Sequence, residues 1–282
     1  MHPPQSWRTS QRSLSLERPL IMGILNVTPD SFSDGNLFFN PQRAIDRALE
    51  MAAEGADIID IGGESTRPRA PAVAADEEMK RIVPVISGLA GKVQCALSVD
   101  TWKSSVAQAA IDAGAEIIND ISGFTFDLRM AAVAAQSGAG VVLMHTRGTP
   151  QEMQTNTAYT DLIGEIMESL RHSAVLAEEA GINRHNLAID PGLGFAKESA
   201  HNLEILRRLR EFTSLGLPLL VGPSRKSFIG KILNRETRQR LHGTAATVAL
   251  AVANGASIVR VHDVREMRDV ADMAHAIAAG NT

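Results

Sequence analysis

The sequence predicts an α/β protein folded as a single-domain (β/α)8 TIM barrel, and three observations lead to this prediction. Eight short runs rich in Ile, Val and Leu recur along the 282 residues, each with the length of a buried strand. Ala-rich stretches with helical periodicity separate these runs and mostly end at a glycine. Buried strands that are connected through helices pair in parallel, and eight such units close most simply into a barrel.

The elements follow one another regularly along the chain. Helix start and stop signals, such as Asn40 with Pro41 and the later Gly55, fall between the apolar runs. A doubly wound open sheet is the alternative, but it usually has fewer strands, and no G-x-G-x-x-G pattern follows the first run. The predicted strands are residues 20–26, 57–63, 95–100, 116–120, 140–145, 186–190, 218–222 and 257–262.

Composition limits the possible classes of function. The chain has 28 Lys and Arg against 32 Asp and Glu, and this near balance argues against a nucleic-acid partner. No run of about 18 apolar residues could span a bilayer, so no membrane association is expected. The single cysteine, Cys95, cannot form an internal disulfide. A cytoplasmic protein fits these features best.

Residues 1–18 are expected to form a flexible N-terminal arm, ahead of a barrel domain over residues 19–282. The arm carries several Arg and Ser residues but lacks the apolar stretch of a secretory signal. An organelle transit peptide would share this composition, although the segment is short and contains two prolines.

Polar residues follow almost every predicted strand. The chemistry of a (β/α)8 barrel lies where its strands end, so these residues are candidates for a functional site. Taken singly, several of them could equally be helix caps or side chains that hydrogen-bond a loop. The candidates are Asn26, residues 62–67, Asp100, Asn119, Asp120, His145, Asp190, residues 224–226, Arg260 and His262.

Two sets of these residues indicate a ligand. Arg260 and His262 lie two positions apart on one strand, so both should point into the barrel mouth, where a buried Arg calls for an anion. Cations at the strand–helix junction in "SRKSFIG" also favour an anion, although Lys226 could instead be a Schiff-base nucleophile. Asp190 in "DPGLGF" suits the paired donors of a pterin or guanine ring, and Asn119 could complete that contact.

Long motifs in fixed order resemble those of dihydropteroate synthases: "GILNVTPDSFSDG", "GGESTRP", "SVDT", "IINDI", "DPGLGF", "SRKSFIG" and "RVHDV". The resemblance runs from about residue 20 to the C-terminus. It implies a transferase of folate biosynthesis that joins 6-hydroxymethyl-7,8-dihydropterin diphosphate to 4-aminobenzoate. Sulfonamides compete with the aminobenzoate in this family. The family is typically homodimeric, and two Ala-rich helices near the C-terminus would permit such packing.

The resemblance also implies a role for individual residues. The implied catalytic residues are Asp100, Asp190, Lys226, Arg260 and His262. The pterin-binding set is Asp100, Asn119, Asp190 and Lys226, with Met144 packing on the ring. Diphosphate contacts are implied for Arg260 and His262, with Asn26 as a protein ligand of a Mg²⁺ cofactor. Thr66, Arg67 and Pro68 match the second mobile loop of the family, and the surroundings of the aminobenzoate match Phe195, Lys226 and Ser227.

Four positions depart from the family pattern. Asn36 follows Gly35 where the family usually has a second glycine, with a small expected effect on loop motion, and Thr146 stands where the family often has Met. "GFAK" places Ala196 where a glycine is commoner, which should stiffen the turn after Phe195. Arg147 stands at a variable position of the family and adds a charge near the barrel mouth.

Elementary chemistry agrees with the implied reaction. Aromatic amines are weak nucleophiles, so we expect an SN1-like loss of diphosphate, with Mg²⁺, Arg260 and His262 as the stabilising cations. The polar loop after the first strand should then fold over the diphosphate and exclude water. One alternative is a pterin-binding methyltransferase on the same barrel, which has no need of the diphosphate cluster. Another is a non-catalytic pterin-binding paralogue that stabilises a partner.

Overall fold

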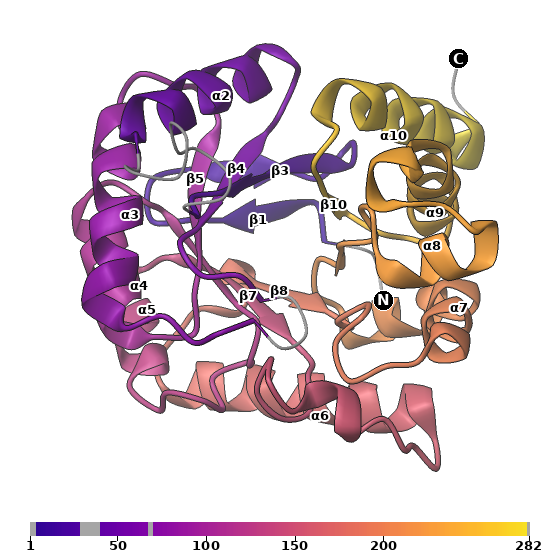
Figure 1. Ribbon diagram of the computed structural model, residues 1–282. Coiled ribbons are helices and arrows are strands. Elements are labelled where there is room, and N and C mark those ends of the chain that lie inside the picture. Colours follow the sequence, from indigo (N-terminus) through magenta and orange to yellow (C-terminus); the bar gives the residue numbers. More distant parts are fainter. Residues whose placement is uncertain (1–3, 29–39, 67–69, 281–282) are drawn as a thin grey trace.

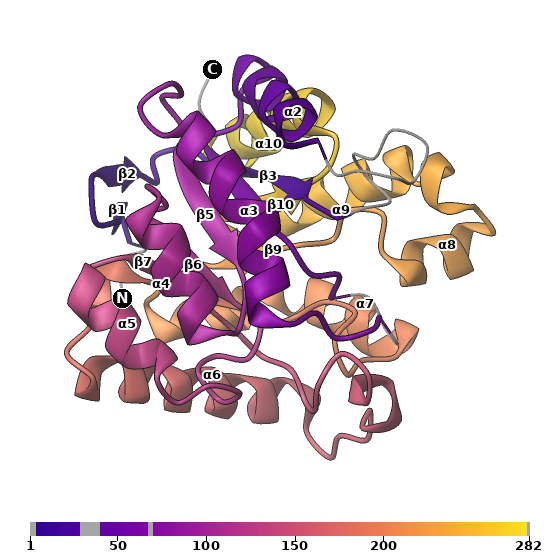
Figure 2. The ribbon, with the colours of Figure 1, turned by 60° about the vertical axis from the view of Figure 1, so that its left-hand side comes forward.

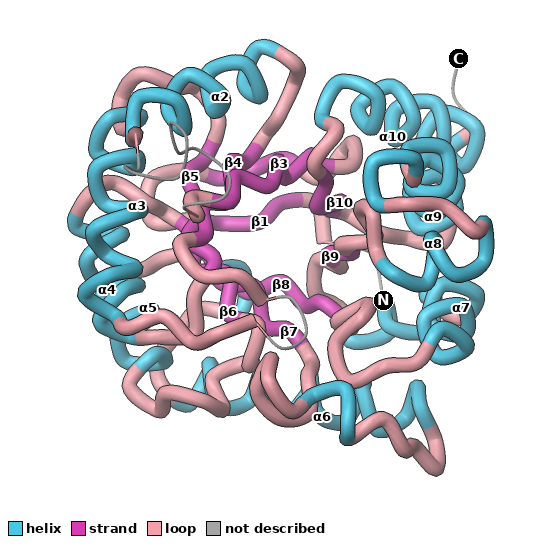
Figure 3. The backbone as a smooth tube through the Cα atoms, viewed as in Figure 1, coloured by secondary structure: helices cyan, strands magenta, loops and turns pink. Residues whose placement is uncertain are grey.

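The computed structural model describes residues 4–28, 40–66 and 70–280 and confirms the predicted (β/α)8 barrel. Eight parallel strands form one sheet in the order β8-β7-β6-β5-β4-β3-β10-β9. Where the two ends of the sheet meet, Ile189 bridges to Leu219 and donates its N–H to the carbonyl of Pro218 at 2.9 Å, which closes the barrel. Figures 1 and 3 show the strands at the centre of a ring of helices.

The barrel strands agree with the predicted runs to within two residues. They are β3 (Leu20–Asn26), β4 (Ile58–Gly62), β5 (Ala96–Asp100), β6 (Ile117–Asp120), β7 (Gly140–Met144), β8 (Leu187–Asp190), β9 (Leu220–Val221) and β10 (Ile258–Val261).

Helices follow each of these strands. As predicted, Asn40 caps the first of them, because its side chain accepts from the Gln42 N–H at 2.9 Å and Pro41 occupies the first turn. Among the described residues, no helix is long and apolar enough to cross a membrane. The helices are α2 (Pro41–Ala53), α3 (Ala75–Leu89), α4 (Ser104–Asp112), α5 (Met130–Ser137), α6 (Leu162–Glu179), α7 (Ser199–Arg207), α8 (Ser227–Leu233), α9 (Leu241–Ala253) and α10 (Val264–Ala279).

The interior of the barrel changes from apolar to polar along its axis. Side chains alternate along a strand, so every second residue faces inward. The lower layer is a buried apolar cluster of Trp7, Leu20, Met22, Ile58, Ala96, Ile117, Val142, Ala188, Leu220 and Ile258. Two residues further along their strands lie the polar side chains of Asp60, Ser98, Asn119, Asp190 and Arg260. The polar layer therefore lies directly above a buried apolar layer.

An N-terminal hairpin completes this lower apolar layer. β1 (Ser6–Arg8) pairs antiparallel with β2 (Ser13–Ser15) at the end of the barrel that lies opposite α8 in Figure 2. Trp7 is fully buried, and its Nε1–H donates to the carbonyl of Asn186 at 2.8 Å. This ordered hairpin differs from the flexible arm expected for residues 1–18. The difference arises because one large apolar side chain fills the space that the inward residues leave at the bottom of the barrel.

Candidate active site

The carboxyl ends of the barrel strands bring most of the predicted site residues into one pocket. Its lining includes eight of them: Thr66, Asp100, Asn119, Met144, Asp190, Phe195, Lys226 and Arg260. Ile121, Leu193 and Gly222 complete the lining. Arg67 and Pro68, together with most of the polar loop after β3, lie outside the described residues.

Three other predicted residues do not line this pocket. Asn26 ends β3, in register with Gly62 of β4, and is half-buried. His262 directly follows β10, and Ser227 begins α8, where it lines a neighbouring cavity.

A buried ionic network lies below the pocket. Arg260 donates from Nε to Asp60 and from Nη2 to Asp100, both at 2.6 Å. Asp60, which is fully buried, also accepts from the Ser98 hydroxyl at 2.6 Å and from the Asn119 side-chain amide at 2.9 Å. The anion that a buried Arg260 was expected to need is therefore supplied, at least in part, by the protein itself.

Sequence reasoning missed Asp60. The candidates were polar residues at or near the ends of the predicted strands, whereas Asp60 lies in the middle of β4. The signal was present, since an Asp inside the apolar run "DIIDIGG" must either face the polar end of the barrel or remain buried without a partner.

Asp120 has a structural role, unlike its neighbour Asn119. Its side chain accepts from the Ser122 N–H at 2.8 Å and from the Phe124 N–H at 2.9 Å, and it points away from the pocket lining. Asp120 therefore stabilises the turn after β6 and is not a helix cap, because α5 begins only at Met130. Asn119 faces inward by the period of two.

Hydrogen-bond acceptors dominate the polar part of the pocket. Oδ1 of Asp100 is buried and has no hydrogen-bond partner among the described residues. The side-chain NH₂ group of Asn119 donates a hydrogen bond to Asp60, which leaves its carbonyl oxygen available to a ligand. Asp190 accepts the Gly192 N–H at 2.7 Å. Burial raises the pKa of Asp100 to about 7 and that of Asp190 to about 6.

The remaining walls suit a flat ring beside a cation. Ile121, Met144 and Phe195 belong to one buried apolar cluster, and Nζ of Lys226 lies 4.4 Å from the centre of the Phe195 ring. Burial, with the nearby Arg260, lowers the pKa of Lys226 to about 8.

Gly192 brings the "DPGLGF" turn close to the loop after β7. Its φ is +73°, and an added Cβ would meet the carbonyl oxygen of His145 at 2.1 Å, so only glycine fits. The tight turn directs the Asp190 carboxylate into the pocket.

His262 is a neutral donor rather than the cation that was expected. Burial, followed by the charge of Arg260, lowers its pKa to about 3. The Ser224 hydroxyl accepts the His262 backbone N–H at 3.1 Å and lies 2.9 Å from Nδ1, to which it can donate its own proton. Nδ1 is then the acceptor, and Nε2 carries the N–H.

Arg225 does not contribute a cation to the pocket. Its guanidinium forms a bidentate ion pair with Asp263 and its backbone N–H donates to Thr244 at 3.1 Å. Of the basic residues in "SRKSFIG", Lys226 lines the pocket, and Arg225 holds the junction in place.

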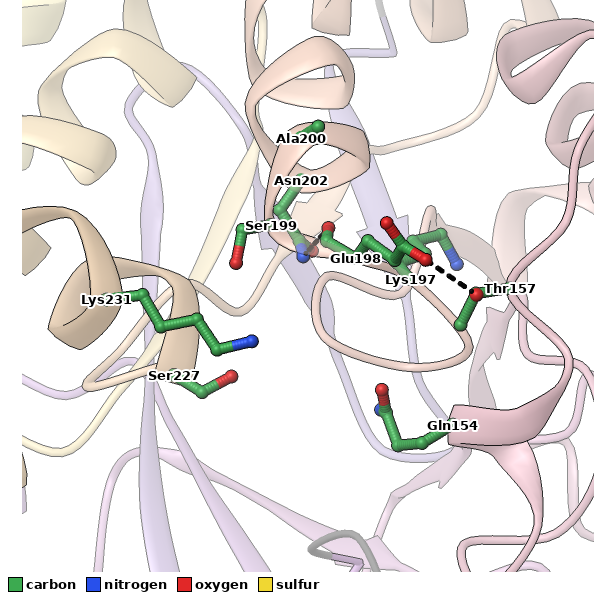
Figure 4. Close-up of a pocket in the computed structure, with 9 residues that line it drawn as sticks. All are labelled: Gln154, Thr157, Lys197, Glu198, Ser199, Ala200, Asn202, Ser227 and Lys231. Atoms are coloured by element: carbon green, nitrogen blue, oxygen red, sulfur yellow. Dashed lines mark hydrogen bonds between the residues drawn. The ribbon is translucent and has the colours of Figure 1, made fainter.

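A second cavity of about 390 Å³ adjoins this pocket. Figure 4 shows Ser227 and Lys231 of α8 reaching toward Ser199 at the start of α7, with Gln154 on another side. Lys226 and Ser227 are consecutive residues that line the first and the second cavity, respectively, so the two spaces are neighbours.

Hydrogen bonds connect the loop after β7 to the loop after β8. Nζ of the buried Lys197 lies 2.9 Å from Nδ1 of His145 and donates to the Phe195 carbonyl at 2.9 Å. The Tyr159 hydroxyl donates to the Ala196 carbonyl at 3.1 Å. The simpler interpretation of His145 was a hydrogen bond to its own loop, "TRGTP", whereas the side chain bonds Lys197 of the loop after β8. These bonds fix the position of Phe195.

Two of the four departures from the family pattern, Ala196 and Arg147, have structural consequences, whereas Asn36 lies outside the described residues. Ala196 adopts a left-handed φ of +51°, which costs an L-residue about 1–2 kcal/mol. The Arg147 guanidinium stacks 3.8 Å from the centre of the Tyr159 ring and pairs with Glu165 of α6, which balances its charge.

The described residues alone form no metal site. They contain no group of three His, Cys, Asp or Glu side chains that could hold a metal ion. The predicted Mg²⁺ ligand, Asn26, is a single amide oxygen at a strand end. Such a residue fits an ion that is held mainly by water and phosphate, because Mg²⁺ commonly keeps several waters and takes few protein ligands.

Comparisons with known proteins agree with this geometry. The family model "Pterin binding enzyme" matches residues 22–262. A dihydropteroate synthase from Synechocystis sp. is 49% identical over 262 residues, which cover 93% of this chain and 91% of the relative. The structure of a Yersinia pestis dihydropteroate synthase with a sulfonamide drug complex matches with a TM-score of 0.92 and 43% identity, covering 97% and 99% of the two chains. That of a Xanthomonas albilineans dihydropteroate synthase with 4-aminobenzoic acid matches with a TM-score of 0.91 and 42% identity over 98% of each chain. This chain therefore belongs to the pterin-binding enzymes and, within them, to the dihydropteroate synthase family.

Proposed function

We propose that this chain condenses 6-hydroxymethyl-7,8-dihydropterin diphosphate with 4-aminobenzoate to give 7,8-dihydropteroate and diphosphate. The observation that carries this proposal is the single pocket in which carboxylate and amide acceptors lie beside the cations Lys226 and Arg260. A heterocycle rich in N–H groups and an attached anion match these two halves.

The heterocycle lies in the inner part of the pocket. The unpaired Oδ1 of Asp100, the carbonyl of Asn119 and the carboxylate of Asp190 accept its N–H groups, while Met144 packs on the ring. Lys226 lines the same pocket, where its charge favours the attached diphosphate.

Bond cleavage precedes bond formation in the proposed mechanism. The C–O bond to the pterin methylene breaks with its electron pair leaving on the diphosphate, and Arg260, Lys226 and the Nε2–H of His262 stabilise that charge. Asp190 and Asp100 stabilise the pterin cation. The aminobenzoate nitrogen then bonds to the methylene carbon and loses a proton to water. A bound Mg²⁺, with Asn26 as its protein ligand, would add charge neutralisation on the diphosphate.

The aminobenzoate lies between the two cavities. Its amine must reach the pterin methylene beside Phe195 and Lys226, and its carboxylate then points toward Ser227 and Lys231 in the second cavity (Figure 4). Sulfonamides, which mimic this substrate, would compete for the same position.

Diphosphate release tests the proposal directly. The purified chain should release diphosphate only when the pterin diphosphate, 4-aminobenzoate and Mg²⁺ are all present, with stoichiometric dihydropteroate. Transfer of a methyl group to a corrinoid protein, or pterin binding without turnover, would instead support one of the two alternatives.

Pterin affinity should rise with pH through the acid range. Asp190 and Asp100 have raised pKa values of about 6 and about 7. Protonation removes the negative charge of each carboxylate and turns one acceptor oxygen into a donor, so below these values each group weakens binding by up to about tenfold per pH unit. Calorimetry with 6-hydroxymethyl-7,8-dihydropterin between about pH 5.5 and pH 8 checks this, and the alcohol avoids titration of the diphosphate itself. Constant affinity over this range would contradict the assignment.

The active chain is proposed to be a cytoplasmic homodimer. α9 and α10 pack side by side (Figure 1), and they expose Leu250, Met273 and Ile277, each more than half accessible to solvent. Light scattering should give twice the chain mass of 30.2 kDa. Glu substitutions at Leu250 and Met273 should yield monomers, whereas Leu128→Glu, at an exposed residue elsewhere, should not. A monomeric parent protein would contradict the proposal.

A further inference from the structure

We propose that Asp60 is a positioning residue that determines whether the oxygen or the NH₂ group of the Asn119 side chain points toward the pterin. The inference rests on the proposed function and adds a residue to it. Asp60 is fully buried and does not line the pocket, so it can act on a ligand only through its neighbours.

The Asn119 amide could in principle present either its oxygen or its NH₂ group to the pocket. Its Nδ2 lies 2.9 Å from Oδ2 of Asp60, and both residues are almost inaccessible to solvent. A flipped amide would place two acceptor oxygens against each other without water to separate them, which is costly at a buried position. Asp60 thereby turns the Asn119 carbonyl toward the ligand.

Asp60 is itself held in place by hydrogen bonds to both of its carboxylate oxygens. The Ser98 hydroxyl, on the neighbouring strand and in register with Asp60, donates to Oδ1 at 2.6 Å. Oδ2 accepts from both Asn119 and Arg260. The carboxylate cannot rotate without breaking these bonds, so the amide orientation is set before any ligand arrives.

This arrangement determines the hydrogen-bond pattern of the pocket. With the amide so oriented, Asp100, Asn119 and Asp190 all present acceptors. The inner part of the pocket then selects a ring edge that carries N–H donors and disfavours one that carries lone pairs. A free amide would lose this selectivity, because it could present either group.

Two substitutions at Asp60 separate positioning from charge. Asp60→Ala removes the acceptor, and affinity for 6-hydroxymethyl-7,8-dihydropterin should fall by about 10- to 100-fold. Asp60→Asn removes the same charge, yet its Oδ1 can still accept from Asn119 while its NH₂ group donates to the Ser98 hydroxyl. We expect the Asn variant to remain within about fivefold of the parent. Equal losses for Ala and Asn would mean that only the charge matters, and would overturn the inference.

A double-substitution cycle tests whether Asp60 acts through Asn119. In an Asn119→Ala background, Asp60→Ala should reduce pterin affinity by less than about threefold. The matched control is Thr9→Ala, which removes a buried hydrogen bond to Glu116 outside this network and should leave affinity within about threefold. An undiminished effect of Asp60→Ala in the Asn119→Ala background would contradict the inference. A parent protein that binds no pterin would contradict the proposed function instead.

The unsubstituted protein supplies a test that does not depend on the folding of variants. A neutron structure of the pterin complex should place the Asn119 side-chain NH₂ deuterons toward Asp60 and its oxygen toward the pterin. An NH₂ group that faces the ligand would show that the amide is reversed.

Discussion

Asp190→Asn should lower the affinity for 6-hydroxymethyl-7,8-dihydropterin by about 100-fold or more, with no loss of the fold. The Asn oxygen can still accept the Gly192 N–H, which is 2.7 Å from Oδ1 in the parent, so the turn should persist. The side-chain NH₂ group would then face ring N–H groups, replacing charge-assisted hydrogen bonds with opposed donors. Calorimetry measures the affinity, and circular dichroism checks the fold.

The matched control is Asp112→Asn, at an exposed acid on α4 that hydrogen-bonds only Gln108 in its own helix. It should bind the pterin like the parent. If Asp190→Asn also retained its affinity, the heterocycle could not lie against this carboxylate.

Arg260→Ala should reduce the free energy of unfolding by about 3–5 kcal/mol at pH 8, as well as impairing diphosphate binding. It leaves two buried carboxylates, Asp60 and Asp100, without the cation that bonds both at 2.6 Å. From sequence alone, Arg260 was expected to serve the diphosphate only. The network implies that the alcohol form of the pterin will also bind less well.

The destabilisation of this variant should be smaller at about pH 5.5 than at pH 8. The pKa of Asp100 is already raised to about 7 in the parent, and Arg260 opposes that rise. Without Arg260, the carboxyl is protonated at the lower pH and carries no charge that needs a partner. Urea denaturation at both pH values provides the measurement, with Arg171→Ala, at an exposed residue, as the control. A loss below about 1 kcal/mol at pH 8 would show that solvent replaces the ion pair.

Much of this fold could be predicted from local signals. Strands and helices follow from apolar runs, caps and glycines, all of which act within a few residues of the chain. The hairpin at residues 6–15 could not be found in this way, because its stability comes from Trp7 packing against strands that lie far away in the sequence.

The site likewise combines residues that local patterns predict with properties that depend on distant contacts. Residues at strand ends, such as Asp100 and Asp190, were found because the barrel topology brings strand ends together. The pairing of Asp60 with Arg260 joins positions 200 residues apart, and the neutral state of His262 depends on burial. Neither property leaves a local pattern in the sequence.

The burial of Trp7 at the bottom of the barrel has a practical consequence for the design of shortened forms of this protein. The family model begins its match at residue 22, which makes that position an inviting start for a trimmed expression clone. Such a clone would lack the Trp7 indole as well as Leu20 and Ile21 of β3, and it would open a cavity beneath Ile58 and Ile117. A lower yield or activity of that clone would then result from lost packing at the bottom of the barrel, far from the active site, and should not be interpreted as a defect in catalysis.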